Sequence, residues 1–116
     1  MQKMSWQENR KKEIEILLEL IEKNFSIKKE TLVSRCRDKS LVLARKLLMN
    51  VLFEVFENDK VTQGDISNII GRDRTSFIHH RAKHIDEHNR YKNYKQEYDS
   101  FKKEYKELLK NNNENT

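Results

Sequence analysis

The segment from Val61 to Ile85 constrains the fold more than any other part of the chain, because it holds two helical patterns separated by a glycine. Thr62 and Asp65 have the spacing of a capping box, and isoleucines follow them at helical intervals. Gly71 tolerates the positive φ that ends a helix. The pattern predicts a helix-turn-helix over about residues 62–88.

The second helix of this motif has Asp73 or Thr75 as its predicted N-cap. Apolar residues at i, i+4 and i+7 predict its buried side, which is formed by Ile78, Ala82 and Ile85 with Phe77 beside them. Polar residues occupy the opposite side: Ser76, His80 and Lys83. An anchored helix with a polar outer side and a basic first turn has the layout of a recognition helix that reads DNA.

The composition predicts an all-α protein, since the chain has no proline, only two glycines and abundant Glu, Lys and Leu. Its 116 residues suffice for one domain with a modest core. We expect a single helical bundle over residues 1–110. The asparagine-rich end, residues 111–116, is predicted to be a disordered tail.

Three further helices are expected before the helix-turn-helix. A long first helix ends near Lys23, and a short one spans about Lys28 to Ser34 with Leu32 and Val33 facing inward. The third, from Lys39 or Ser40 to Phe56, is so rich in apolar residues that it should be the buried centre of the bundle.

The last predicted element is a long amphipathic helix over about residues 89–110. Its aromatic and apolar residues step by three and four, at Tyr91, Tyr94, Tyr98, Phe101, Tyr105 and Leu108. Helix propensity is weakest near His88–Arg90, so we expect a break there and a fold-back of the stripe onto the first helix, at Ile14, Leu17 and Ile21. The alternative is a homodimer formed through this helix.

The net charge of +5 is unevenly distributed. Residues 28–46 carry seven basic and two acidic groups, and residues 71–95 carry seven basic and three acidic groups. Two basic segments that a helix-turn-helix brings together suggest a surface for nucleic-acid phosphates. The alternative is that these charges belong to solvated helix faces.

No catalytic constellation is present, so an enzyme is not expected. Cys36 with a histidine could imitate a nucleophile and its base, but nothing supplies an oriented third group or an oxyanion site. His80, His84 and His88 share one helical face, but they lack a carboxylate or thiolate spaced to complete a zinc site. We therefore expect no metal and no cofactor. No apolar run approaches the ~20 residues of a membrane span, and a single cysteine favours the cytoplasm.

Two ungapped stretches carry a resemblance to a known family. The first is IGRDRTSFIHH at residues 70–80, and the second is SRCRDKS at 34–40 followed by Ala44, Arg45, Lys46 and Met49. Together they resemble the DNA-binding C-terminal domain of the bacterial replication initiator DnaA, over roughly residues 21 to 85. The chain departs from that family in having one glycine before Arg72 instead of two, and Arg74 where the family has histidine. It also lacks the phosphate-binding loop of the initiator's ATPase.

The resemblance implies duplex DNA as partner and replication-initiation proteins as further partners. The candidates for DNA contact are Arg35, Arg37, Lys39, Arg45, Arg72, Asp73, Arg74, Thr75, Ser76, His80 and Lys83. Arginine forks suit phosphates or guanine edges, Thr75 offers a methyl or a hydroxyl, and Asp73 either accepts from a base amino group or only caps its helix. Arg45 matches a family arginine that contacts DNA, and its alternative is pairing with a nearby glutamate or reaching water.

The function expected from these features is sequence-specific binding of double-stranded DNA in replication or transcription control, without an ATPase. The substitution at Arg74 predicts a preferred site that differs from the usual initiator box in at least one base. The alternative is a protein-protein interaction module that uses the helical bundle and its aromatic tail.

Overall fold

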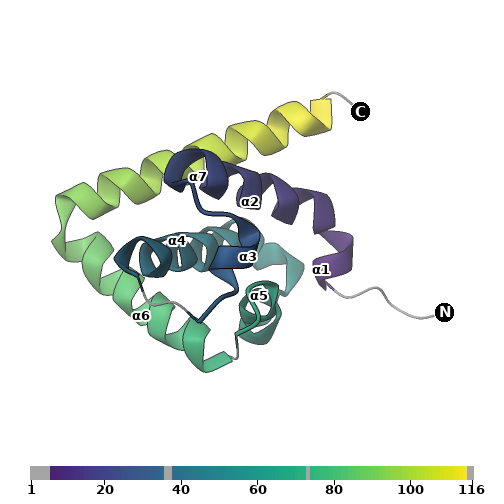
Figure 1. Cartoon of the computed structure of the whole chain (residues 1–116). Coiled ribbons are helices and arrows are strands. Elements are labelled where there is room, and N and C mark those ends of the chain that lie inside the picture. Colours follow the sequence, from purple (N-terminus) through teal and green to yellow (C-terminus); the bar gives the residue numbers. More distant parts are fainter. Residues whose placement is uncertain (1–5, 36–37, 73, 115–116) are drawn as a thin grey trace.

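The structure, a computed structural model, describes residues 6–35, 38–72 and 74–114, and the regular structure of these residues is helical throughout. The predicted all-α bundle is therefore confirmed. Helix α4 (Lys39–Val55) lies in the middle, and the other long helices pack around it (Figure 1). Among the described residues, no helix is both long enough and apolar enough to cross a membrane.

The N-terminal segment is divided into α1 (Trp6–Asn9) and α2 (Lys11–Phe25), where the sequence predicted one long helix. The division falls at Arg10, whose φ of −113° and ψ of 22° are not helical. The Arg10 guanidinium donates to Asp59 Oδ2 at 2.6 Å and lies 5.1 Å from the centre of the Phe56 ring. Contacts with a distant part of the chain thus fix a bend that the local apolar pattern does not encode.

The next two helices agree closely with the prediction. Helix α3 (Lys29–Leu32) is short and buries Leu32, although Val33, predicted to face inward, is 38% exposed. Helix α4 begins after Asp38, whose side chain accepts a hydrogen bond from the Ser40 amide at 2.9 Å. A buried, predominantly apolar helix at the centre lets five other α-helices pack against it: α2, α3, α5, α6 and α7.

The helix-turn-helix consists of α5 (Gln63–Ile69) and α6 (Arg74–Arg90), which follow the short 3-10 helix η1 (Glu57–Asp59). The predicted capping box is present, since Thr62 Oγ1 accepts from the Asp65 amide at 3.0 Å and Asp65 Oδ2 accepts from the Thr62 amide at 3.1 Å. Thr62 therefore fixes the start of α5 by local chemistry alone.

The turn between these helices is centred on Gly71, whose φ is 66°. The Arg72 amide donates to the Ser67 carbonyl at 2.9 Å, and the Gly71 amide donates to the Asn68 carbonyl at 3.1 Å. This pair of bonds is the Schellman motif, which needs a left-handed residue after the helix. A side chain at position 71 would be strained by this φ whatever space surrounds it.

Helix α6 buries a different side from the one predicted. Phe77 and His84 are 1% and 4% exposed, whereas Ile78 and Ile85 are each 47% exposed and Ala82 is exposed too. Of the predicted apolar side, Phe77 is buried as expected, whereas Ile78, Ala82 and Ile85 face solvent. The reason is that α4 presents polar groups to α6, so that hydrogen-bonding side chains of α6 are buried in place of the isoleucines.

Buried Asn50 on α4 illustrates this polar packing. Its side-chain amide donates to the Lys46 carbonyl at 2.9 Å and to the His80 carbonyl at 3.4 Å, and its oxygen accepts from Arg81 Nη1 at 2.9 Å. On the same helix, Lys46 forms an ion pair of 2.8 Å with Glu87 of α6. The rotation of α6 is therefore set by partners that sequence periodicity does not reveal.

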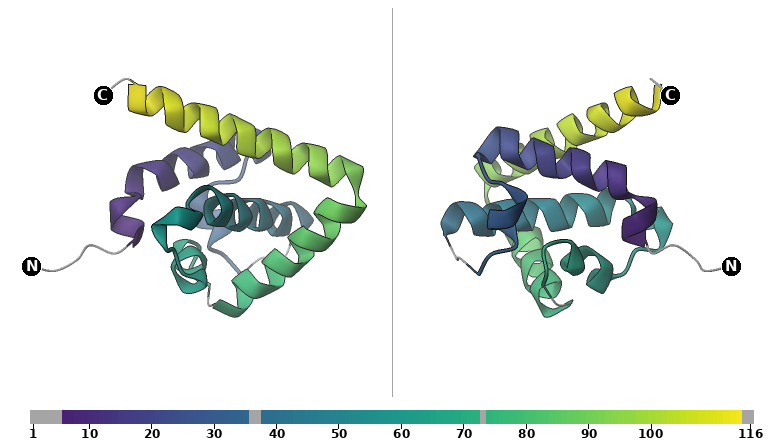
Figure 2. Two further views of the ribbon diagram at one scale, coloured as in Figure 1. Left: turned by 180° about the vertical axis from the view of Figure 1, so that it is seen from behind. Right: turned by 45° about the vertical axis from the view of Figure 1, so that its right-hand side comes forward.

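The chain turns at Tyr91, and α7 (Lys92–Glu114) returns across the bundle against α2, α4 and α6, as both views in Figure 2 show. The aromatic stripe is buried in this interface at Tyr94, Tyr98, Phe101 and Tyr105. The predicted fold-back is thus present, with the break at Tyr91. Residues 111–114, predicted as part of a disordered tail, continue the helix, and residues 115–116 lie outside the described part of the chain.

Candidate functional site

A groove of about 710 Å³ runs beside the start of α6 and contains the largest group of predicted contact residues. It is lined by residues from four parts of the chain: Arg35, Val42, Arg45, Arg72, Thr75, Ser76, His79 and His80. Three of these are arginines, from the segment after α3, from α4 and from the helix-turn-helix turn. The fold thus unites the two basic segments of the sequence at one surface.

Arg45 has a structural position in this groove, which does not fit the predicted contact with DNA. It is 4% exposed, and its guanidinium donates to the Leu32 carbonyl at 2.9 Å and to the Ser34 carbonyl at 2.8 Å. The half-buried Arg72 donates to the same Ser34 carbonyl. Both arginines therefore hold the segment after α3 against the turn, which places the exposed Arg35 at the mouth of the groove.

The pKa of His80 depends on its burial and on the positive charges around the groove. Burial, and to a smaller extent the charges of His79, Lys46, Arg45 and Arg72, lower the pKa of His80 to about 4. The imidazole is therefore neutral at pH 7. The positive neighbours that contribute to this shift would attract an anion, whereas burial by itself would not.

The first turns of α6 project from the rim of the groove. Arg74 is exposed, and its Nε donates to Gln63 Oε1 of α5 at 3.0 Å. Thr75 and His79 are exposed one turn apart on the same side of the helix, and Lys83 is exposed one turn further. These side chains reach solvent from a helix that is anchored along its other side.

The predicted contact residues thus fall into three groups. Those in the groove are Arg35, Arg45, Arg72, Thr75, Ser76 and His80; those exposed outside its lining are Lys39, Arg74 and Lys83; Arg37 and Asp73 lie outside the described residues. His79 was not predicted, although it lies four residues after Thr75 and shares its side of the helix. That spacing alone was sufficient to indicate it.

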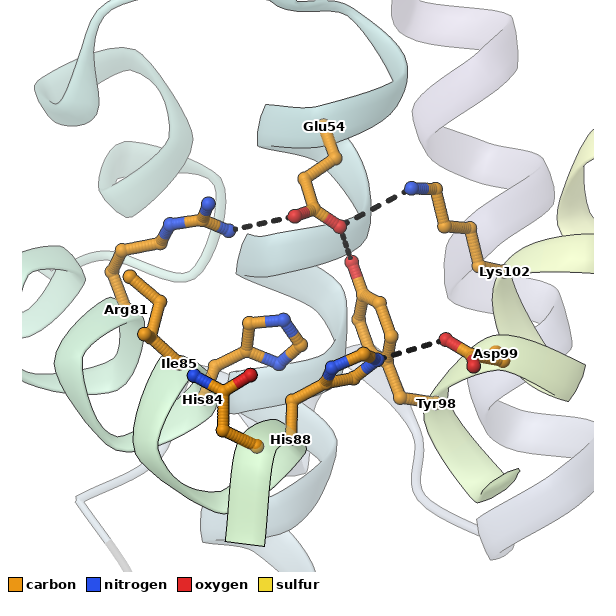
Figure 3. A pocket seen from close by; sticks show the side chains of 9 residues that line it. Glu54, Arg81, His84, Ile85, His88, Tyr98, Asp99 and Lys102 are labelled. Carbon is orange, nitrogen blue, oxygen red and sulfur yellow. Dashed lines mark hydrogen bonds and ion pairs between the residues drawn. The ribbon is translucent and has the colours of Figure 1, made fainter. Parts of the chain in front are cut away.

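A second polar cluster lies where α4, α6 and α7 meet, around a cavity of about 270 Å³ (Figure 3). The Glu54 carboxylate accepts from Arg81 Nη1 at 3.1 Å, from Lys102 Nζ at 3.2 Å and from the Tyr98 hydroxyl. Burial by itself raises the pKa of Glu54, but the hydrogen bonds from Tyr98 and Arg81 and the charge of Lys102 lower it to about 2. So acidic a group is a poor proton acceptor at neutral pH, and its geometry ties α6 and α7 to α4.

Two histidines of α6 complete this cluster. His84 Nδ1 lies 2.7 Å from the Tyr94 hydroxyl, and His88 Nε2 lies 3.0 Å from Asp99 Oδ1. Burial lowers the pKa of His84 to about 4. Through these contacts with Tyr94 and Asp99, both histidines link α6 to α7. Within residues 6–35, 38–72 and 74–114, no three His, Cys, Asp or Glu side chains are grouped so as to hold a metal ion.

The chain has no match among protein-family models, curated proteins or solved structures. The basic groove and the exposed first turns of α6 are the features from which its function is inferred.

Proposed function

We propose that this chain binds double-stranded DNA sequence-specifically through its helix-turn-helix and acts in the control of replication or transcription. The observation that carries the proposal is the groove, in which arginines from three parts of the chain meet beside the exposed start of α6. Clustered cations next to an accessible helix match a duplex, which offers phosphates on both sides of a readable groove.

In the proposed complex, the N-terminal half of α6 enters the major groove. Arg74, Thr75 and His79 are exposed there, and they approach base edges. The capping box of α5 and the Gly71 turn set the angle between the two helices. The polar contacts of Asn50 with the His80 carbonyl and Arg81 hold α6 in this orientation.

The phosphate contacts are assigned to residues that solvent reaches. Arg35 lines the groove beside α6, Lys39 is exposed at the start of α4, and Lys83 is exposed on α6 itself. Arg45 and Arg72 act as positioning residues, because their guanidiniums already donate to the Ser34 carbonyl. Their charge still contributes to the positive field of the groove.

Two further considerations support this proposal. The resemblance of residues 70–80 and 34–49 to the initiator's DNA-binding domain points to the same surface, and it favours a cytoplasmic role in replication. The alternative, a protein-interaction module that uses the helical bundle and its aromatic tail, has less of the tail available to it, because Tyr94, Tyr98, Phe101 and Tyr105 are buried within the bundle. Tyr91 and Leu108 are the members of the stripe that remain exposed.

The test is fluorescence polarisation with a random duplex pool, followed by selection of a preferred sequence and measurement over a range of salt concentrations. Arg35→Ala should weaken binding to selected and random duplexes alike and reduce the salt slope by about 0.9. Thr75→Ala should cost about 1 to 3 kcal/mol on the selected duplex with little effect on random DNA. Lys106→Ala, an exposed lysine on α7, is the control and should change neither. Absence of binding at low salt would refute the proposal.

A further inference from the structure

The outer side of α6 carries apolar side chains that the described chain covers only in part. Ile78 and Ile85 are each 47% exposed, and Ala82 lies exposed between them. Thr75, Ile78 and Ala82 are spaced at i, i+3 and i+7, so that they form one line along the helix and each ends in a methyl group. Two exposed isoleucines on an otherwise charged helix call for a binding explanation.

The surroundings of this line identify the kind of surface that fits it. Exposed Arg74, His79 and Lys83 flank it, and the basic groove with Arg35 adjoins its N-terminal end. The complementary surface therefore has apolar groups on its floor and anions along its walls. The DNA major groove has this arrangement wherever thymine is present, because the C5 methyl of thymine is the apolar group exposed there.

An acidic residue limits a contact between this apolar line and an anionic surface to the first half of α6. Asp86 is exposed beyond Ala82, where its carboxylate pairs with Arg90 at 2.9 Å. Ile85 lies beside this acidic residue and also borders the cavity at the α6–α7 corner (Figure 3). Recognition helices contact bases mainly through their N-terminal residues, so Ile78 and Ala82 lie at suitable positions and Ile85 lies beyond them.

We infer that Ile78 and Ala82, together with the Thr75 methyl, read thymine methyl groups in the major groove. This inference rests on the proposed function and specifies what the same surface selects. Ile78 and Ala82 are about 6 Å apart along the helix axis, at about 1.5 Å per residue. That separation corresponds to about two base-pair steps of roughly 3.4 Å, so the preferred site contains thymines within two steps of each other.

The experiment replaces each thymine of the selected duplex in turn by deoxyuridine, which pairs identically but has hydrogen in place of the methyl. Loss of one contacted methyl should weaken wild-type binding about fourfold, the factor that corresponds to burial of one apolar carbon. Ile78→Ala should weaken binding to the thymine duplex by at least this factor. At one position of the site, the affinity of this variant should no longer depend on whether thymine or deoxyuridine is present. Ile85→Ala is the matched control, since both isoleucines have the same exposure on the same helix. This variant should bind the thymine duplex with wild-type affinity and should lose affinity on deoxyuridine substitution as the wild type does.

Each contrary outcome has a distinct meaning. Sequence-specific binding with equal affinity for thymine and deoxyuridine duplexes would overturn the inference and leave the proposed function intact. Failure to bind any duplex at low salt would overturn both. A wild-type dimer in light scattering that Ile78→Ala and Ile85→Ala each convert to a monomer would assign the line to contact between two copies of the chain, which also overturns the inference. Circular dichroism of both variants verifies that they are folded.

Discussion

Replacement of Glu54 by glutamine should lower the free energy of unfolding by about 2 kcal/mol at pH 7. Burial raises the pKa of this carboxyl, but the contacts with Tyr98, Arg81 and Lys102 outweigh it and lower the pKa from 4.5 to about 2. A shift of that size corresponds to about 3.4 kcal/mol at roughly 1.4 kcal/mol per pH unit. The side chain is 25% exposed, and glutamine retains part of the hydrogen bonding, so we reduce the figure to about 2 kcal/mol.

The pH dependence makes this prediction specific to the charge. Because the pKa is lower in the folded chain, the stabilisation is complete above about pH 4.5 and is lost as the pH falls toward 2. Thermal unfolding followed by circular dichroism should show a melting temperature about 8 °C lower for Glu54→Gln at neutral pH. The difference from wild type should narrow as the pH falls. Glu107→Gln, an exposed glutamate on α7, should match wild type at both pH values. A Glu54→Gln deficit that is the same at neutral and acidic pH would refute the reasoning.

Three further predictions concern residues elsewhere in the bundle. Arg45→Ala should lower the free energy of unfolding by about 2 to 3 kcal/mol, because two hydrogen bonds from a charged donor are lost. Arg35→Ala should change the free energy of unfolding by less than about 0.5 kcal/mol. If urea unfolding showed the same loss for the two variants, the structural role of Arg45 would be contradicted. Tyr105→Phe should lower the free energy of unfolding by about 1 kcal/mol, because the hydrogen bond to the Glu13 carbonyl is lost, whereas Tyr105→Ala should lower it by about 3 to 5 kcal/mol, because the ring is buried. Similar losses for both variants would show that the ring contributes little. The wild-type chain should lose stability as the pH falls from 6.5 to 4, because the folded-state pKa of His84 is about 4 and protonation therefore favours the unfolded chain over that range; His84→Phe should reduce this loss. A pH profile of urea unfolding that is the same for variant and wild type would contradict this.

The elements that the sequence predicted well are those specified by neighbouring residues. The capping box of Thr62 and Asp65 and the turn at Gly71 depend on groups within a few positions of each other. The central helix and the fold-back of the aromatic stripe followed from strong periodicity, since few arrangements can bury so many rings in a chain this small.

The features that the sequence did not predict depend on partners far along the chain. The bend at Arg10 needs Asp59, which lies 49 positions away. Arg45 was assigned to DNA because it matches a family arginine, and its structural role was missed because its acceptors are backbone carbonyls, which no side-chain pattern identifies. The predicted buried side of α6 was wrong at Ile78, Ala82 and Ile85, because α4 presents to α6 not only Phe53, which packs on Phe77, but also the polar Asn50 and Glu54.

The return of α7 across α2 has a consequence for biosynthesis. The Tyr105 hydroxyl bonds the Glu13 carbonyl at 2.8 Å although the two residues are 92 positions apart. Closing a loop of that length costs roughly 4 kcal/mol of chain entropy. A ribosome releases the N-terminal segment first, so α2 emerges long before the helix that covers it. Until the residues near Tyr105 have left the exit tunnel, the side of α2 that α7 will cover stays open to chaperones and to aggregation.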